Sequence, residues 1–378
     1  MSGLSYRVCT RCVMDTTDPG IAFDAEGVCN HCHSHIAALA AVHRGAEGRE
    51  RMTKIAEQIR REGAGKPYDC VIGVSGGVDS TYVAWLVRQL GLRPLAVHLD
   101  NGWNSDIAVR NIARTIEKLG IDLFTHVIDW EEYRGIQRAF LKASVPDVEI
   151  PTDHAIVATL YAVARKHHVR TIVSGHNDAT ESHLPRAWSQ GHLDYGYIRD
   201  VHRRFGGGRV STFPRIGFVR YLNNVVSGLD TIHLLNDADY SREEALSRIT
   251  AELGWQDYGG KHHESVFTRW YQGCYLPRKF GYDKRKCHLS SLVSSGEMTR
   301  DAALAKLQQP PYDEAVQEQD CDYVAKKLGF TRAELDAIIA APPARFEDFD
   351  SYGKRINGRL FRAARRARKQ VLRAAGRA

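Results

Sequence analysis

Six consecutive residues, Ser75-Gly76-Gly77-Val78-Asp79-Ser80, are of the types needed to hold a phosphate group. Glycines let backbone N–H groups turn toward an anion, and serines add hydroxyl donors. A helix that starts here would contribute the positive end of its dipole. Unlike G-x-x-x-x-G-K-[ST], the segment has no lysine to reach a γ-phosphate. It predicts a nucleotide site rather than a glycine turn without a ligand.

Four cysteines near the start of the chain have the spacing of a metal site. Cys9 and Cys12 form one C-x-x-C pair, and Cys29 and Cys32 form another, with 16 residues between the pairs. This spacing is typical of structural Zn²⁺ held by four thiolates, although a redox or sulfur-transfer role is an alternative. Four thiolates leave no vacancy for His31, His33 or His35. The other cysteines are scattered, and we expect them to be reduced.

Alternating strands and helices are expected to position the phosphate-binding residues. Strands are predicted at 69–74, 93–100, 122–128 and 170–175, and helices at 49–61, 80–90, 106–119, 137–143 and 153–168. Later helices are predicted at 241–254, with Ser241 and Glu244 as a capping box, and at 300–307, 313–328 and 331–341. The alternation indicates a doubly wound parallel sheet with its ligands at the carboxyl ends of the strands. We expect a zinc ribbon at 1–45, an ATP-binding α/β domain at 46–240, and a helical substrate-binding region with a basic tail at 241–378.

The S-G-G-x-D-S segment after an apolar strand resembles the PP-loop of the ATP pyrophosphatases. The resemblance implies a fold of the PP-loop (adenine nucleotide alpha hydrolase-like) type and cleavage between the α- and β-phosphates of ATP. It also places adenine and ribose at the end of the second strand. The residues there are His98, Asp100 and Asn101. The residues that follow the fourth strand could bind ribose, the α-phosphate or Mg²⁺, and they are Gly175, Asn177, Thr180 and Glu181. Asp79 and Glu181 are the candidate ligands of Mg²⁺. The expected catalytic residues of this loop region are Asp79, Ser80 and Glu181. For Glu181, a role as a helix cap is the alternative.

Several further stretches together resemble the N-acetyl sugar amidotransferase family of surface-polysaccharide and flagellar-sugar pathways. They are CTRCVMDTTDPGIAFDAEGVCNHC, LDNGWNS, EIPTDHAI, SGHNDATE, and the block from YGGKHHESVF to FGYDKRKCHLSSLVSSGEMTR, and the resemblance covers about residues 6–312. It implies a reaction in which ATP adenylylates the acetamido oxygen of a nucleotide-linked sugar and ammonia then displaces AMP. The product is an acetamidino group, made for O-antigen (LPS) or related surface sugars.

The same resemblance assigns residues to the sugar nucleotide. Asp153 and His154 would orient the sugar or handle a proton. Cationic side chains suit a diphosphate or a uronate carboxylate. The residues expected to face this substrate are Lys261, His262, Glu264, Arg269, Lys284, Arg285 and Lys286. For any one of them, surface charge or helix capping is the alternative.

No segment resembles a glutaminase, because the N-terminus is not a catalytic cysteine and no cysteine lies in a G-x-C-x-G elbow. We therefore expect a partner glutaminase, of the glutaminase–cyclase type implied by the resemblance, to deliver ammonia. A tRNA-thiolating PP-loop enzyme is the main alternative function. Those enzymes usually have lysine within the loop and a later C-x-x-C, whereas position 78 is valine here. A non-catalytic nucleotide-binding scaffold is a further alternative, against which the intact loop motif argues.

The composition is that of an ordinary globular protein, with 43% hydrophobic and 26% charged residues in 378. The sequence contains neither an apolar run of about 18 residues nor a secretory signal pattern, so we expect a cytoplasmic protein. The net charge of +7 is concentrated in the last segment, from Lys354 to Arg377. We expect a solvated helix there; RNA, a membrane surface or an acidic partner are alternatives, with nucleic acid not favoured.

Overall fold

The computed structural model describes residues 5–39, 42–227, 230–260 and 263–356, and its centre is a five-stranded parallel sheet. The strand order is β3-β2-β1-β4-β5. The strands are β1 (Cys70–Gly73), β2 (Pro94–Asp100), β3 (Asp122–Val127), β4 (Thr171–Val173) and β5 (Asp230–Ile232). The four predicted strands are confirmed, whereas β5 was not predicted. A parallel sheet of this kind, with helices on both faces, confirms the predicted fold class.

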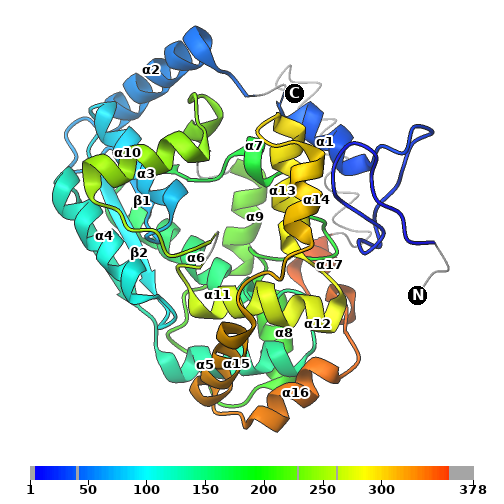
Figure 1. The fold of residues 1–378 in the computed structure, drawn as a ribbon. Helices are drawn as coiled ribbons and strands as arrows, with labels where there is room; N and C mark the ends of the chain where they lie inside the picture. Colours follow the sequence, from blue (N-terminus) through cyan, green and yellow to red (C-terminus); the bar gives the residue numbers. More distant parts are fainter. Residues whose placement is uncertain (1–4, 40–41, 228–229, 261–262, 357–378) are drawn as a thin grey trace, which may run out of the picture.

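Alternate residues of the central strands enter two different cores. Cys70 and Ile72 of β1 pack with helices α2 (Gly45–Glu62), α3 (Val78–Gln89), α4 (Asp106–Leu119) and α10 (Arg242–Leu253). Val71 of β1 packs on the opposite face with α6 (Ile150–Lys166). Because α10 shares a core with α3, the packing of the sheet domain continues past the boundary that we expected at residue 240. Figure 1 shows α3, α4 and α10 together beside the strands.

The rest of the chain forms two helical groups that flank the sheet. One buries a large aromatic core and contains α5, α8, α11, α12, α15, α16 and a π-helical turn at Tyr271–Tyr275. The bounds are α5 (Trp130–Lys142), α8 (Tyr195–Phe205), α11 (Val266–Trp270), α12 (Leu276–Phe280), α15 (Glu314–Leu328) and α16 (Arg332–Ala340). The predicted helix at 153–168 begins three residues earlier, and the three helices predicted after residue 300 are present.

The other group joins the cysteine-rich segment to α13 (Lys284–Ser295) and α14 (Arg300–Leu307). Val13 of the segment packs against Leu289 and Ala303. In Figure 1, α13 and α14 stand between the N-terminal segment and the sheet domain. The remaining helices are α1 (Asn30–Leu39), α7 (Asp178–Glu181), α9 (Phe218–Ser227) and α17 (Tyr352–Ile356), with 3₁₀ turns at Leu234–Asn236 and Phe346–Asp348.

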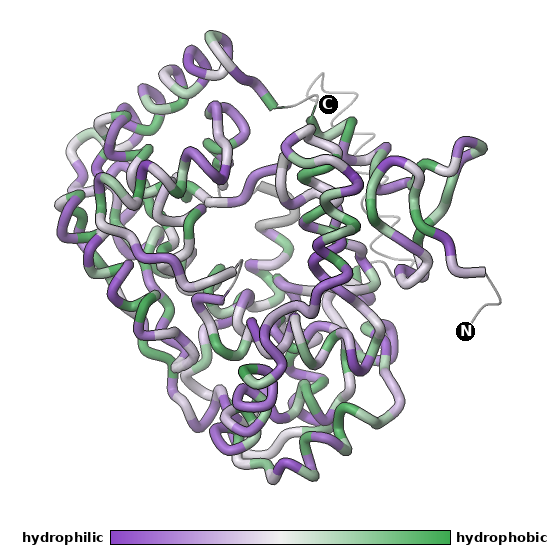
Figure 2. Tube along the Cα trace, in the orientation of Figure 1, coloured by the Kyte–Doolittle hydropathy of each residue, from purple (hydrophilic) through white to green (hydrophobic). Residues whose placement is uncertain are grey.

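Caps explain where several of these helices begin and end. Ser241 accepts a hydrogen bond from the Glu244 N–H at 3.2 Å, as the sequence predicts for the start of α10. Helix α4 begins after Ser105 and ends at Gly120, which adopts the left-handed conformation. The helices mix hydrophilic and hydrophobic residues along their length (Figure 2). Within the described ranges, no helix has both the length and the apolar character needed to cross a membrane.

Candidate active site

The PP-loop connects β1 to α3 and is braced by its own hydroxyl groups. The Ser75 and Ser80 hydroxyls lie 3.1 Å apart, and the Gly77 N–H donates to Ser75 Oγ at 3.2 Å. Gly76 has φ of +80°, and a Cβ at this position would lie 2.5 Å from the Ala108 carbonyl oxygen of α4. The loop can therefore approach α4 this closely only with glycine at position 76.

Two residues from outside the sequence motif form hydrogen bonds with the loop. The Trp255 indole N–H donates to the Gly76 carbonyl at 2.9 Å. The Tyr240 hydroxyl donates to Asp79 Oδ1. Burial, and then the charge of Asp79 with a smaller effect of Glu181, raise the pKa of Tyr240 far above its usual range. No sequence pattern marked Trp255 or Tyr240, because their partners lie more than 150 residues away.

The end of β2 presents a histidine and an asparagine next to the loop. His98 Nδ1 hydrogen bonds with the Val74 carbonyl at 2.9 Å, and its Nε2 lies 3.1 Å from the Asn104 amide nitrogen. Asn101 accepts the Trp103 N–H and lines the same cavity as His98. Asp100 accepts the Gly102 N–H at 2.9 Å and is not part of that lining.

The end of β4 packs against the start of α3. A Cβ on Gly175 would lie 3.3 Å from the Ser80 amide nitrogen. Asn177 caps α7 by accepting the Thr180 N–H and hydroxyl, both at 2.9 Å. The Asn177 side-chain amide nitrogen is nevertheless buried without a hydrogen-bond partner, and such a donor is rarely left unpaired in a folded protein. Asn177 is 1% exposed and lines neither of the two cavities described below.

Glu181 follows in α7 and forms an ion pair with His176 at 2.8 Å, which raises the pKa of His176. Glu181 lines the second of the two cavities described below, whereas Asp79 lies in the loop and accepts the Tyr240 hydroxyl. Carboxylate oxygens are ligands that suit Mg²⁺, the cation that a PP-loop protein requires for its nucleotide.

Two cavities meet at this site. The first has a volume of about 540 Å³ and contains the loop serines, with His98, Asn101 and Gly175, while Leu160, Tyr161 and Ile172 give it an apolar side. The second has a volume of about 790 Å³ and lies between α7 and α13. Both cavities are lined by Glu149, Asp153 and Thr268. A nucleotide in the first cavity and a second substrate in the other would therefore face each other across these three residues.

Glu149 was not predicted from the sequence, although it opens the EIPTDHAI stretch. Its Oε2 accepts the Thr268 hydroxyl at 2.6 Å. Burial, and then the charge of Asp153, raise the pKa of Glu149 to about 8. A carboxyl group that titrates near neutral pH beside two cavities is suited to proton transfer. The signal in the sequence was an acidic residue directly before a helix that begins with Ile-Pro.

His154 does not fit the role that the sequence suggested. It is fully buried, its Nδ1 donates to the His192 carbonyl at 2.8 Å, and its Nε2 accepts the Ile216 N–H at 3.0 Å. Burial lowers the pKa of His154 to about 4. Because both ring nitrogens are used by backbone groups, His154 is a structural residue. Its neighbour Asp153 does line both cavities, with His192 Nε2 at 3.4 Å.

The structure divides the predicted substrate-binding residues. Lys284 and Arg285 line the second cavity, and Glu264 lines the first. Arg269 and Lys286 line neither cavity. Arg269 forms an ion pair with Asp320 through two hydrogen bonds, and Lys286 forms an ion pair with Asp15 at 2.5 Å. Lys261 and His262 lie outside the described residues. Arg242, His192 and Lys306 also line the second cavity and were not predicted.

The four predicted zinc ligands form one buried cluster. All four sulfur atoms lie within 4.8 Å of one another, and three of the separations are 3.7, 3.7 and 3.9 Å. A tetrahedron with Zn–S bonds of about 2.3 Å has edges of about 3.8 Å. The cluster is therefore compatible with structural zinc. His31 and His33 pair with Asp18 and Asp24 instead, as expected if four thiolates fill the site.

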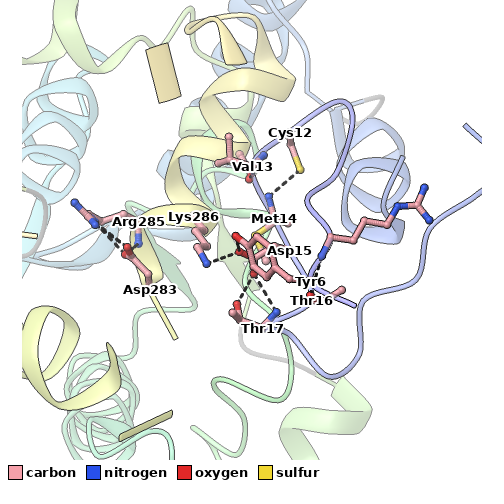
Figure 3. Close-up of polar contacts among 12 residues, drawn as sticks. Tyr6, Cys12, Val13, Met14, Asp15, Thr16, Thr17, Asp283, Arg285 and Lys286 are labelled. Atoms are coloured by element: carbon pink, nitrogen blue, oxygen red, sulfur yellow. Dashed lines mark hydrogen bonds and ion pairs between the residues drawn. The ribbon is translucent and has the colours of Figure 1, made fainter. Parts of the chain in front are cut away.

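The cysteine cluster is tied to helix α13 and through it to the second cavity. Figure 3 shows Asp15 between Tyr6, Thr17 and Lys286, the last of which belongs to α13. Arg300 donates to the Cys9 and Cys12 carbonyls. Lys286 therefore connects the ribbon to α13, while the adjacent residues Lys284 and Arg285 line the cavity.

Comparisons with known proteins agree with this arrangement. Residues 49–184 match the NAD synthase family model, and residues 264–364 match the model described as LPS biosynthesis protein WbpG-like, C-terminal domain. The first match covers the PP-loop and the sheet, and the second covers most of the late helical region. Together they define a PP-loop protein with a WbpG-like C-terminal domain. The two matches support the resemblance to PP-loop amidotransferases seen in the sequence.

Individual relatives match smaller parts of the chain. The GMP synthase (glutamine-hydrolyzing) of Pyrobaculum aerophilum is 37% identical over 75 residues, which are 20% of this chain and 14% of that protein. The structure of NMN synthetase from Francisella tularensis has 19% identity and a TM-score of 0.28, covering 58% of this chain and 96% of that chain. NH₃-dependent NAD synthetase from Campylobacter jejuni has 15% identity and a TM-score of 0.30, covering 55% and 85%.

Proposed function

We propose that the protein is an ATP-dependent amidotransferase that converts an acetamido group of a nucleotide-linked sugar to an acetamidino group. The acetamido oxygen would attack the α-phosphorus of ATP and release pyrophosphate, and ammonia would then displace AMP. The observation that carries this proposal is the contact between the two cavities at Glu149, Asp153 and Thr268. It allows ATP and a bulky second substrate to bind with their reacting atoms close together, as such a transfer requires.

The first cavity would hold ATP. The PP-loop residues Ser75 to Ser80 would surround its phosphates, with the N-terminus of α3 stabilising the negative charge. His98 and Asn101 would lie beside the ribose and adenine, with Gly175 allowing close approach at the α-phosphate. Asp79 and Glu181 would hold Mg²⁺, which neutralises charge on the departing pyrophosphate.

The second cavity would hold the sugar nucleotide. Its lining includes the cationic residues Lys284, Arg285, Arg242 and Lys306. Cationic side chains suit the diphosphate of a nucleotide sugar. The Lys284 ammonium lies 4.9 Å from the centre of the Tyr271 ring, a favourable cation–π contact that restrains its position. The description of the matching C-terminal family names LPS biosynthesis, which supports a surface sugar as the substrate class.

Ammonia would come from a separate glutaminase. A glutaminase that uses cysteine needs a reactive and accessible thiol. All eight cysteines of the sequence lie in the described residues, and all are buried. Burial of these thiols supports the delivery of ammonia by a partner subunit.

The test is incubation of the purified protein with Mg²⁺–ATP, ammonium chloride and a panel of UDP- and CMP-linked N-acetyl sugars. The expected result is sugar-dependent formation of AMP and pyrophosphate. The sugar should lose about one mass unit, because NH replaces oxygen. Glutamine in place of ammonium should give no product. Absence of AMP with every sugar, or incorporation of sulfur into tRNA by the protein, would contradict the proposal.

A further inference from the structure

Glu149 lies at the boundary between the two cavities. Among the described residues that line them, it is the one buried carboxylate common to both linings. Both cavities include it in their lining, although its residue is only 9% exposed. Thr268 of α11 donates to Oε2 at 2.6 Å, and Thr152 of α6 approaches Oε1 at 3.4 Å. Two elements thus fix the orientation of the carboxyl group at the place where the substrates would meet.

Asp153 shares the boundary but differs in its surroundings. Its side chain is 45% exposed, and the His192 ring nitrogen lies 3.4 Å away. An exposed carboxyl group on the lining of both cavities can form hydrogen bonds with a bound substrate. Asp153 is therefore suited to a hydrogen bond with the sugar, whereas the buried carboxyl group of Glu149 is suited to exchange a proton.

We propose that Glu149 contacts the acetamido group and carries a proton between the two half-reactions, an inference that rests on the function proposed above. No sequence motif assigns this residue. Its position on both cavity walls and its fixed orientation support the assignment.

The proton balance is as follows. As the acetamido oxygen forms its bond to the α-phosphorus and the bond to pyrophosphate breaks, the Glu149 carboxylate takes the amide N–H proton. The product is a neutral O-adenylyl imidate. As ammonia adds to the imidate carbon, Glu149 returns that proton to the imidate nitrogen and then accepts one from the new ammonium group. AMP leaves with the former acetamido oxygen, the sugar keeps an amidinium group, and Glu149 releases its proton to pyrophosphate or water.

The surroundings of Glu149 suit this exchange. Burial and nearby carboxylates raise its pKa, while Thr268 and Lys284 oppose that rise, with a net value of about 8. A carboxyl group with a pKa near the working pH can both accept and return a proton. The titratable groups on the elements around it are Asp147, Asp153, Tyr133, Tyr271, His192 and Lys284.

The test compares Glu149→Gln with the wild-type protein. Glutamine keeps the shape and a hydrogen bond to Thr268 but cannot accept the amide proton. With the sugar that supports turnover, kcat should fall at least about 100-fold, while the Kd for ATP should change less than twofold. The wild-type rate should rise with pH up to about 8, and the residual rate of Glu149→Gln should lack this rise. Thr268→Val should move the rise to higher pH, because the carboxylate loses its donor.

Glu117→Gln on the exposed face of α4 is the matched control and should behave as the wild type. Unchanged melting temperatures would show that the variants are folded. A Glu149→Gln variant with wild-type kcat and an unchanged pH profile would overturn this inference and leave the proposed function intact. A wild-type protein that forms no AMP with any sugar of the panel would overturn the proposed function, and this inference with it.

Discussion

Gly76 shows how much of the nucleotide site depends on a single residue. Its φ of +80° and its 2.5 Å approach to the Ala108 carbonyl leave no room for a side chain. Gly76→Ala should destabilise the protein by at least about 1 kcal/mol and abolish AMP formation, since the loop must shift away from α4. Chemical denaturation and the AMP assay would measure both effects.

Gly207→Ala is the control for this substitution, because no atom lies within 4 Å of the added Cβ and the backbone there does not have a positive φ. It should leave both stability and activity unchanged. A Gly76→Ala protein that binds and cleaves ATP normally would show that the loop does not need its present conformation.

The raised pKa of Glu149 should also make the stability of the protein depend on pH. Its pKa is raised from 4.5 to about 8 in the folded protein, so the folded state retains a proton that the unfolded chain releases. This contribution to stability is fully present below pH 4.5 and is lost as pH rises through about 8. Each pH unit between these limits should cost up to about 1.4 kcal/mol.

Glu149→Gln should therefore lose stability less steeply than the wild type between pH 5 and about 8. Urea unfolding at several pH values would show the difference. Parallel stability curves for the two proteins would mean that the folded protein does not hold the Glu149 proton.

Single residues differ in how far the sequence alone could assign them. Ser75 to Ser80 could be identified because all the groups that hold a phosphate are contiguous. His154 was misassigned because its neutral, buried state depends on the His192 carbonyl and the Ile216 N–H, which come from distant segments. Glu149 was missed for the same reason, since its raised pKa depends on burial beneath α11.

At the scale of elements, α13 is the structural connection between the cysteine cluster and the second cavity. One end of the connection is the Lys286–Asp15 pair, and Arg300 adds hydrogen bonds to the Cys9 and Cys12 carbonyls (Figure 3 shows the first). A small segment such as this depends on its metal for folding. The position of α13 should therefore depend on zinc.

Cys12→Ser should reduce bound zinc and raise the KM for the sugar nucleotide about ten- to hundredfold, while the Kd for ATP stays within about twofold. The reason is that ATP would bind in the sheet domain, whereas Lys284 and Arg285 depend on α13. Metal analysis and steady-state kinetics would test this. Cys274→Ser, a buried cysteine outside the cluster, is the control. Loss of ATP binding in Cys12→Ser would contradict this division.

The prediction of elements succeeded where a hydrophobic pattern was long enough to show a period. Helix α4 lies at the predicted bounds because Ser105 and Gly120 mark its ends. Strands β4 and β5 each have three residues, but β4 reads Thr-Ile-Val, whereas β5 reads Asp-Thr-Ile and has a single apolar residue. Strand β5 is therefore recognisable only from its pairing with β4. Helices α8 and α9 lie in a segment whose polar and glycine-rich composition hid the helical period.

At the scale of the whole molecule, the site is assembled from three parts of the chain. The sheet domain supplies the PP-loop, the region after residue 260 supplies Thr268, Lys284 and Arg285, and the cysteine segment supports α13. Under the proposed function, the shared wall would let the nucleotide and the sugar react before ammonia arrives. The predicted order is adenylylation first and amination second.

This order gives a test that needs no ammonia. With radiolabelled pyrophosphate, Mg²⁺–ATP and the acceptor sugar, the protein should catalyse exchange of label into ATP in the absence of ammonium, because the O-adenylyl imidate can return to ATP. Omission of the sugar should reduce the exchange to background, and Asp79→Asn should abolish it through loss of a metal ligand. Exchange that requires ammonium would show instead that nitrogen binds before the acetamido oxygen is activated, and the shared wall at Glu149 would then have to accommodate all three reactants at once.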